Sequence, residues 1–168
     1  ILKVDNLSKV FLRGGQQPVT SVKNVSFELM PGECLGVLGE SGSGKTTMVS
    51  MITRLLDVTV GQIILDGQDI THLKEKELRK LRGKDISMIF QEPMTALNPT
   101  RRIGQQMVEV IRHHQALSRT DARQKAVALL EEMQIPDAPE VMKRFPFELS
   151  GGMRQRVMIA LAFSCEPE

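Results

Sequence analysis

A chain of 168 residues is long enough to bury a hydrophobic core without disulfides or bound metals. Its 41% hydrophobic content, 25% charged content and net charge of +2 exclude a disordered polymer and a strongly basic nucleic-acid binder. No apolar run approaches the length of a membrane-spanning helix, and two cysteines, Cys34 and Cys165, give no disulfide framework.

The first half of the chain has the pattern of strands. Residues 1–12 and 19–30 alternate between polar and apolar side chains, which predicts an antiparallel pair. Residues 34–38 are a continuous apolar run, which is typical of a central strand buried on both faces, and residues 86–90 are a second candidate for a buried strand. Residues 62–65 predict a further strand that ends in an Asp-Gly turn.

Helical periodicity begins at Lys45, where apolar residues recur at helical spacing. These residues are Met48, Met51, Ile52 and Leu55. A short, highly charged helix is predicted over 74–82, and from 103 onward nearly all of the chain is predicted to be helical. The chain therefore divides into a β-rich first half and a helical second half, with the change near 91–100.

Capping residues mark the ends of the later helices. Ser118 followed by Asp121 predicts a helix start, because the hydroxyl can accept a hydrogen bond from a free backbone N–H. Pro136 and Pro139 are expected to end that helix. The last helix is expected to begin near Gly151.

The strongest motif is Gly39-Glu40-Ser41-Gly42-Ser43-Gly44-Lys45-Thr46, which fits the phosphate-binding pattern G-x-x-x-x-G-K-[ST]. Glycines allow the backbone N–H groups to point inward, and the following helix N-terminus favours an anion. Lys45 supplies a positive charge, and the Thr46 hydroxyl is an oxygen ligand suited to Mg²⁺. The alternative is a plain Gly/Ser turn between two elements, which the strand-loop-helix context disfavours.

A second motif lies downstream, at Leu149-Ser150-Gly151-Gly152-Met153-Arg154-Gln155-Arg156. Its serine and glycines stand at a helix start, where free N–H groups and the helix dipole favour an anion. Alone, it could also be an ordinary serine cap with flexible glycines, which is the less favoured alternative. Gln91 follows the apolar run 86–90; by itself it is only a polar residue leaving a strand.

Together, these motifs resemble those of ATP-binding-cassette (ABC) ATPases over nearly the whole chain. The stretch Phe90 to Pro99 is similar to the Q-loop region of importers of di- and oligopeptides, glutathione and nickel. Just before the signature motif the chain departs from the family's pattern, because Phe147 stands where His is common. The resemblance implies an α/β P-loop NTPase core with an N-terminal antiparallel β subdomain and a helical subdomain. It divides the chain into a nucleotide-binding part, 1–90, and a Q-loop and helical part, 91–168.

The resemblance also implies the bound groups, ATP and Mg²⁺. Residues 39–47 would bind ATP, with Thr46 and Gln91 toward the metal. Phe11 stands where the family has its adenine-stacking aromatic residue, and a core phenylalanine is an equal alternative. The signature residues would reach the ATP held by a partner cassette: Ser150, Gly151, Gly152 and Gln155.

The function implied is ATP-driven import of di- or oligopeptides, or of similar small solutes, through a membrane permease. Expected partners are a second cassette, identical or different, the permease subunits and, indirectly, an extracytoplasmic solute-binding protein, with no nucleic acid. Arg101-Arg102 lies where permease contact is expected, or in a solvated loop. The expected place is peripheral, on the cytoplasmic face of the inner membrane. Alternatives are a soluble cassette ATPase acting on DNA or ribosomes, and a non-catalytic nucleotide-binding fragment.

The family's strand ending in Asp-Glu (Walker B) and its switch histidine follow the signature, whereas this sequence ends at Glu168. No catalytic residue is therefore identified, and the C-terminal part of the core is expected to be missing. Hydrolysis by these residues alone is expected to be weak or absent. In the family, strands from beyond the signature lie between the strand that precedes the phosphate loop and the strand that precedes the Q-loop. Without them, the edges of these two strands are expected to be unpaired.

Overall fold

The structure is a computed structural model that describes residues 1–12, 17–90 and 96–166. Its contacts divide the chain into two units, Ile1–Leu78 and Arg79–Glu168. The first unit holds a small sheet and the glycine-rich loop, whereas the second is built from helices and carries the downstream motif.

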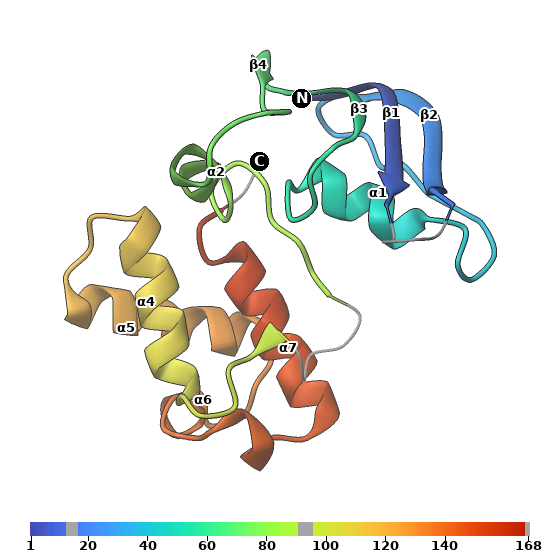
Figure 1. The fold of residues 1–168 in the computed structure, drawn as a ribbon. Coiled ribbons are helices and arrows are strands. Elements are labelled where there is room, and N and C mark those ends of the chain that lie inside the picture. Colours follow the sequence, from blue (N-terminus) through green and yellow to red (C-terminus); the bar gives the residue numbers. More distant parts are fainter. Residues whose placement is uncertain (13–16, 91–95, 167–168) are drawn as a thin grey trace. The chain divides into compact units, whose positions relative to one another are not determined.

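The sheet of the first unit has four strands in the order β2-β1-β3-β4, each antiparallel to its neighbour (Figure 1). The strands are β1 (Leu2–Phe11), β2 (Val19–Leu29), β3 (Val60–Leu65) and β4 (Gln68–Asp69). Leu2 is paired with Leu29 on one side and with Leu65 on the other. The predicted antiparallel pair, the strand at 62–65 and the Asp66-Gly67 turn are therefore confirmed.

Helix α1 (Lys45–Ile52) packs against β1 and β2. Buried side chains come from both layers: Val4, Leu7, Val22, Ile63 and Leu65 from the strands, and Met48, Met51 and Ile52 from the helix. Leu55, expected on the helix, lies beyond its end and is 52% exposed. The helix stops earlier because Arg54 adopts a left-handed backbone with φ 56°.

The two apolar runs at 34–38 and 86–90, predicted as buried central strands, form no strand in the structure. Leu38 is 97% exposed and Phe90 is 41% exposed. A central strand needs a hydrogen-bonded neighbour on each side, and no strand among the described residues pairs with either run. The prediction of buried strands is therefore wrong for these residues.

The second unit is helical, as the periodicity predicts. After α2 (Glu75–Leu81), which crosses the boundary between the units, its elements are α4 (Ile103–His114), α5 (Arg119–Glu132), α6 (Ala138–Val141), a 3₁₀ turn at Pro146–Glu148 and α7 (Gly151–Phe163). Helix α5 packs against α4, α6 and α7. Ile103, Met107 and Ile111 of α4 are completely buried in the shared core.

The ends of α5 show which capping predictions hold. Ser118 Oγ accepts a hydrogen bond from the Asp121 N–H (3.1 Å), which confirms the predicted start. The helix ends at Glu132, before either proline, because Gln134 turns the backbone with φ 54°. Pro139 lies at the start of α6, where its missing N–H needs no partner, so it begins a helix and does not end one.

Candidate functional site

The glycine-rich loop at 39–44 leads directly into α1. Gly42 and Gly44 have φ of 81° and 93°, values that residues with a Cβ rarely adopt. A Cβ on Gly44 would lie 2.3 Å from the Ser21 carbonyl oxygen of β2. The motif glycines are therefore required by the path of the loop and by its close approach to the sheet.

Lys45 holds its ammonium group against its own loop. Nζ donates hydrogen bonds to the carbonyl oxygens of Gly39 (2.7 Å) and Glu40 (2.6 Å), and to the Ser43 hydroxyl (3.3 Å). A Cβ on Gly39 would lie 2.8 Å from Ser43 Oγ, so the backbone is closely wrapped here. The loop thus surrounds a positive charge at the start of a helix, which is the arrangement that an anionic phosphate group prefers.

The first turn of α1 adds to this positive field. It contains no acidic residue, and Gly44 at the N-cap has no side chain to cap the free N–H groups. Thr47 Oγ1 accepts a hydrogen bond from the Ser21 hydroxyl of β2 (3.2 Å), which fixes the turn to the sheet. Thr46 is exposed, and its hydroxyl has no hydrogen-bond partner among the described residues. The turn therefore offers N–H groups to an anion and one oxygen ligand to a cation.

The downstream motif also stands at a helix start. Ser150 is the N-cap of α7, and its Oγ accepts a hydrogen bond from the Met153 N–H (3.3 Å). A Cβ on Gly151 or on Gly152 would meet no described atom within 4 Å. Packing within the described residues therefore does not require these two glycines. Their open surface suits close approach by something outside the chain.

The other predicted site residues have different surroundings. Phe11 is 36% exposed, with the Lys9 ammonium 5.3 Å from its ring centre, so it is not a buried core residue. Gln155 is exposed on α7. Gln91 lies outside the described residues. The structure thus gathers 39–47 into one loop and the first turn of α1, and 150–155 onto the start of α7.

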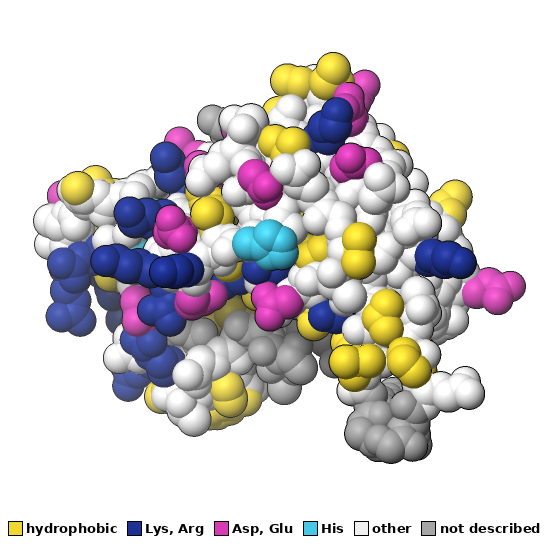
Figure 2. Space-filling view, turned by 45° about the horizontal axis from the view of Figure 1, so that its top comes forward, with side chains coloured by type: hydrophobic (Ala, Val, Ile, Leu, Met, Phe, Trp, Pro, Cys, Tyr) yellow, Lys and Arg dark blue, Asp and Glu magenta, His cyan; other side chains and the backbone are white. Residues whose placement is uncertain are grey.

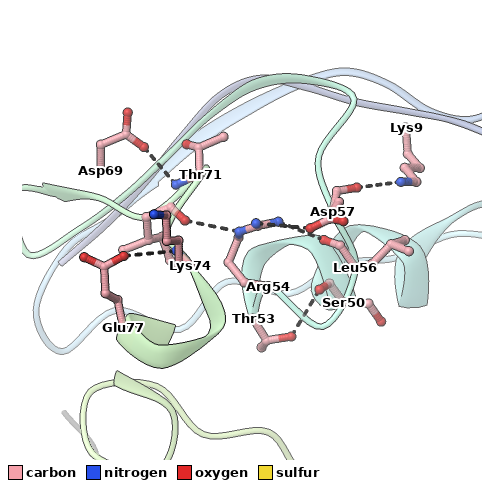
Figure 3. A network of polar contacts seen from close by, with 11 residues as sticks. Lys9, Ser50, Thr53, Arg54, Leu56, Asp57, Asp69, Thr71, Lys74 and Glu77 are labelled. Atoms are coloured by element: carbon pink, nitrogen blue, oxygen red, sulfur yellow. Dashed lines mark hydrogen bonds and ion pairs between the residues drawn. The ribbon is translucent and has the colours of Figure 1, made fainter. Parts of the chain in front are cut away.

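A buried arginine, Arg54, supports the first unit at the other end of α1, and no sequence motif points to it (Figure 3). Arg54 donates hydrogen bonds from Nε to the Ile70 carbonyl oxygen (3.1 Å) and from Nη1 to that of Leu56 (3.3 Å). Its Nη2 lies 3.2 Å from a carboxylate oxygen of Asp57. This guanidinium ties the helix that follows the phosphate loop to the segment after β4.

Asp69 of β4, beside this network, links β3 to the residues that follow β4. It accepts hydrogen bonds from the Thr71 N–H (2.8 Å) and from Gln62 Nε2 (2.7 Å). Hydrogen bonding by Thr71, followed by that from Gln62, lowers the pKa of the Asp69 carboxyl below its usual value. The ionised form of Asp69 therefore stabilises the hairpin that Arg54 contacts.

The described residues contain neither a ready-made metal site nor a membrane-spanning helix. Within residues 1–12, 17–90 and 96–166, no three His, Cys, Asp or Glu side chains are grouped to hold a metal ion. No helix in those residues has the length and apolar character needed to cross a bilayer.

Phe147, where the resemblance leads one to expect His, is 65% exposed and stacks on Phe145 with ring centres 5.4 Å apart.

Comparison with known proteins places this geometry in a family. The model of the family "ABC transporter" matches residues 22–168. The chain is 63% identical, over 89% of its length, to the probable D,D-dipeptide transport ATP-binding protein DdpD of Escherichia coli (strain K12). It is 44% identical, over 99% of its length, to the glutathione import ATP-binding protein GsiA of the same strain. It spans 47% and 28% of the length of these two relatives.

Solved structures agree with the sequence matches. A dimeric structure of the bacterial ABC transporter cassette MJ0796 is 30% identical and superposes with a TM-score of 0.87, covering 99% of this chain and 71% of that one. A post-hydrolysis state of the same cassette, bound to ADP and Pi, superposes with a TM-score of 0.88. The predicted fold class is therefore confirmed, and the chain belongs to the ABC transporter family.

Proposed function

We propose that this chain is the ATP-binding part of an importer subunit that couples ATP binding and hydrolysis to uptake of di- or oligopeptides, or of similar small solutes. The observation that carries the proposal is the loop 39–44 wrapped around the Lys45 ammonium, at the start of a helix whose first turn holds no carboxylate. Such a site favours the polyphosphate of a nucleotide over a neutral or cationic ligand.

ATP binding in this proposal uses one continuous segment. The backbone N–H groups and side chains of 39–47 contact the phosphates, and Lys45 exchanges its carbonyl partners for phosphate oxygens. Phe11, exposed at the end of β1, provides a ring for the adenine. The binding of ADP and Pi by a cassette that is 30% identical to this chain supports the assignment.

Mg²⁺ would be held by the exposed Thr46 hydroxyl and by Gln91, which lies outside the described residues. Both are oxygen ligands of the kind that Mg²⁺ prefers. When bound, the ion would neutralise charge on the phosphate oxygens. No catalytic residue for hydrolysis is assigned within this chain, and hydrolysis is proposed for the whole protein.

The signature residues are proposed to act on a partner's nucleotide. Ser150, Gly151 and Gly152 offer a capped helix start with open glycines, and Gln155 is exposed one turn further on. A second cassette, identical or different, would place its ATP there; the dimeric structure of the similar bacterial cassette supports this arrangement.

The remaining assignments concern the whole protein. Relatives described as a dipeptide transport protein and a glutathione import protein support a peptide-class solute. Partners would be permease subunits and, indirectly, an extracytoplasmic solute-binding protein, with the protein peripheral on the cytoplasmic face of the inner membrane. We also propose 1–90 and 91–168 as the nucleotide-binding and helical parts; this boundary lies a short way along the chain from the one that the contacts give.

The proposal is tested by purifying the whole protein from membranes and measuring phosphate release from MgATP. We expect permease subunits to co-purify, and Lys45→Met to abolish the release while the exposed Lys23→Met leaves it intact. Co-purification of DNA or ribosomes that stimulate the release would contradict import and favour a soluble cassette ATPase. Nucleotide binding without release by the whole protein would contradict the motor function.

A further inference from the structure

The helical unit contains a pocket that the phosphate loop and the signature do not use. Its volume is about 660 Å³, within the range of small-molecule sites. It is formed by α4, the start of α5 and the segment after α6, all within the second unit. Six cationic side chains line it: Arg101, Arg102, Arg112, Arg119, Arg123 and Lys143.

The charge of this pocket is one-sided. One carboxylate, Glu109, lines it, and that group is already paired with Arg101. Because the whole chain carries a net charge of only +2, the positive charge is concentrated here. Figure 2 shows Lys and Arg side chains gathered on the side of the molecule where α4 and α5 lie.

Some of these cations already have partners. Lys143 Nζ lies 2.5 Å from Glu140, and the Arg102 guanidinium stands 5.5 Å from the Phe145 ring centre. Arg112, Arg119 and Arg123 are exposed, and within the described part of the chain no carboxylate lies within ion-pair distance of them. Three arginines are therefore free to bind an anion from outside.

Folding does not account for two of these arginines. Arg119 is the first residue of α5, where a positive charge opposes the helix dipole. Arg123 follows one turn later, so the two like charges repel each other. Asp121, the acidic residue of this first turn, already accepts a hydrogen bond from the Ser118 hydroxyl (2.7 Å). A bound anion would relieve both unfavourable interactions.

The pocket's chemistry identifies the kind of anion. Five of the six cations are arginines, whose planar guanidinium groups form paired hydrogen bonds with phosphate oxygens. Gly104, Val108 and Met142 add an uncharged wall, and the volume suits a small molecule or a headgroup. We propose that this pocket binds a ligand carrying two or more phosphate groups, supplied either by a soluble oligophosphate or by the headgroups of anionic phospholipids.

The test uses the full chain with Lys45→Ala, so that the phosphate loop does not contribute to binding. Sodium tripolyphosphate is titrated by calorimetry at low salt without Mg²⁺, and vesicles of phosphatidylcholine with cardiolipin, whose headgroup carries two phosphates, are tested by co-sedimentation. Replacing Arg112, Arg119 and Arg123 together by Ala is expected to weaken binding at least about tenfold, since the loss of even one charge-assisted contact is worth that much. The variant should fold, because Ala at 119 and 123 removes unfavourable charges.

The matched control removes the same charge elsewhere, at the exposed Lys23, Lys76 and Lys80. Loss of tripolyphosphate binding in the arginine variant, but not in the lysine control, supports a soluble ligand. Loss of vesicle binding in the arginine variant, with tripolyphosphate binding unchanged, supports a lipid headgroup. Equal loss in both variants, or no binding of either probe, overturns the proposal. Tighter binding of a glutamate-rich peptide than of tripolyphosphate also overturns it, because the pocket would then serve a protein partner.

Discussion

Two groups of apolar side chains, one on a helix and one in a predicted strand, differ sharply in burial. On α4, Ile103, Met107 and Ile111 are completely buried, whereas in the run 34–38 before the phosphate loop Leu38 is 97% exposed. A helix satisfies its backbone hydrogen bonds internally and needs only side-chain neighbours, which α5 supplies a few residues later. A central strand also needs backbone partners on both sides, and these come from distant parts of a chain. The comparison shows that packing between neighbouring helices is enough to bury the apolar side chains of α4. The run 34–38 stays exposed because it lacks strand partners among the described residues.

The largest expected effect is in the closed core. Ile111→Ala on α4 removes a side chain with no exposed surface and leaves a cavity, so we expect a loss of about 2–5 kcal/mol in the free energy of unfolding. Urea denaturation followed by circular dichroism measures this change.

The matched control is Leu38→Ala in the exposed run, which is expected to change the free energy of unfolding by less than about 0.5 kcal/mol. If Leu38→Ala cost as much as Ile111→Ala, the run would be buried in solution and the comparison would fail.

The next effect concerns the first unit. Arg54→Ala leaves the Ile70 and Leu56 carbonyl oxygens without their guanidinium donor, so we expect a loss of roughly 1–3 kcal/mol in the free energy of unfolding. Asp57→Ala is the control, because that carboxylate is 88% exposed. Thermal unfolding distinguishes the two variants, and equal losses would mean that the ion pair, and not the carbonyl contacts, carries the stability.

A smaller effect is expected at the signature helix. Ser150→Ala removes the hydroxyl that accepts the Met153 N–H, at a cost of about 1 kcal/mol in unfolding free energy. Ser150→Asn keeps a capping oxygen and is expected to restore most of that stability. If Ser150→Asn were as unstable as Ser150→Ala, the cap would not be the reason for the loss.

The smallest effect is a pH dependence at the end of α4. Burial, and then the nearby His113 charge, lowers the pKa of His114 below its ordinary value of 6.5, with an opposing contribution from Asp85. The unfolded chain therefore binds more protons below pH 6.5, so stability falls as the pH drops from 6.5 through the lowered pKa.

His114→Gln is expected to flatten this slope, and His72→Gln, on an exposed residue, is expected to leave it unchanged. Melting temperatures measured between pH 7.5 and 5 check the expectation. An unchanged slope in His114→Gln would show that another group causes it.

What the sequence could predict follows the same division between local and distant interactions. The cap at Ser118, the helical character from 103 onward and the phosphate loop before Lys45 each depend on residues close in sequence, and all could be placed in advance. Burial of 34–38 could not be judged, because it depends on strands from elsewhere.

The arginine network and the cationic pocket also escaped prediction. Arg54 contacts Ile70 across a hairpin, and the pocket brings Arg101 together with Lys143. No residue spacing in the sequence marks either feature, because both arise when separate elements fold against one another.

The central claim is that the loop 39–44 and Lys45 bind the phosphates of ATP, and calorimetric titration of the protein with MgATP tests it most directly. We predict saturable binding that weakens at least about tenfold in Lys45→Ala, because a charge-assisted contact to phosphate is lost, and that stays unchanged in Lys23→Ala. Absence of ATP binding by folded protein, or equal affinity of the Lys45→Ala variant and the parent, would contradict the claim.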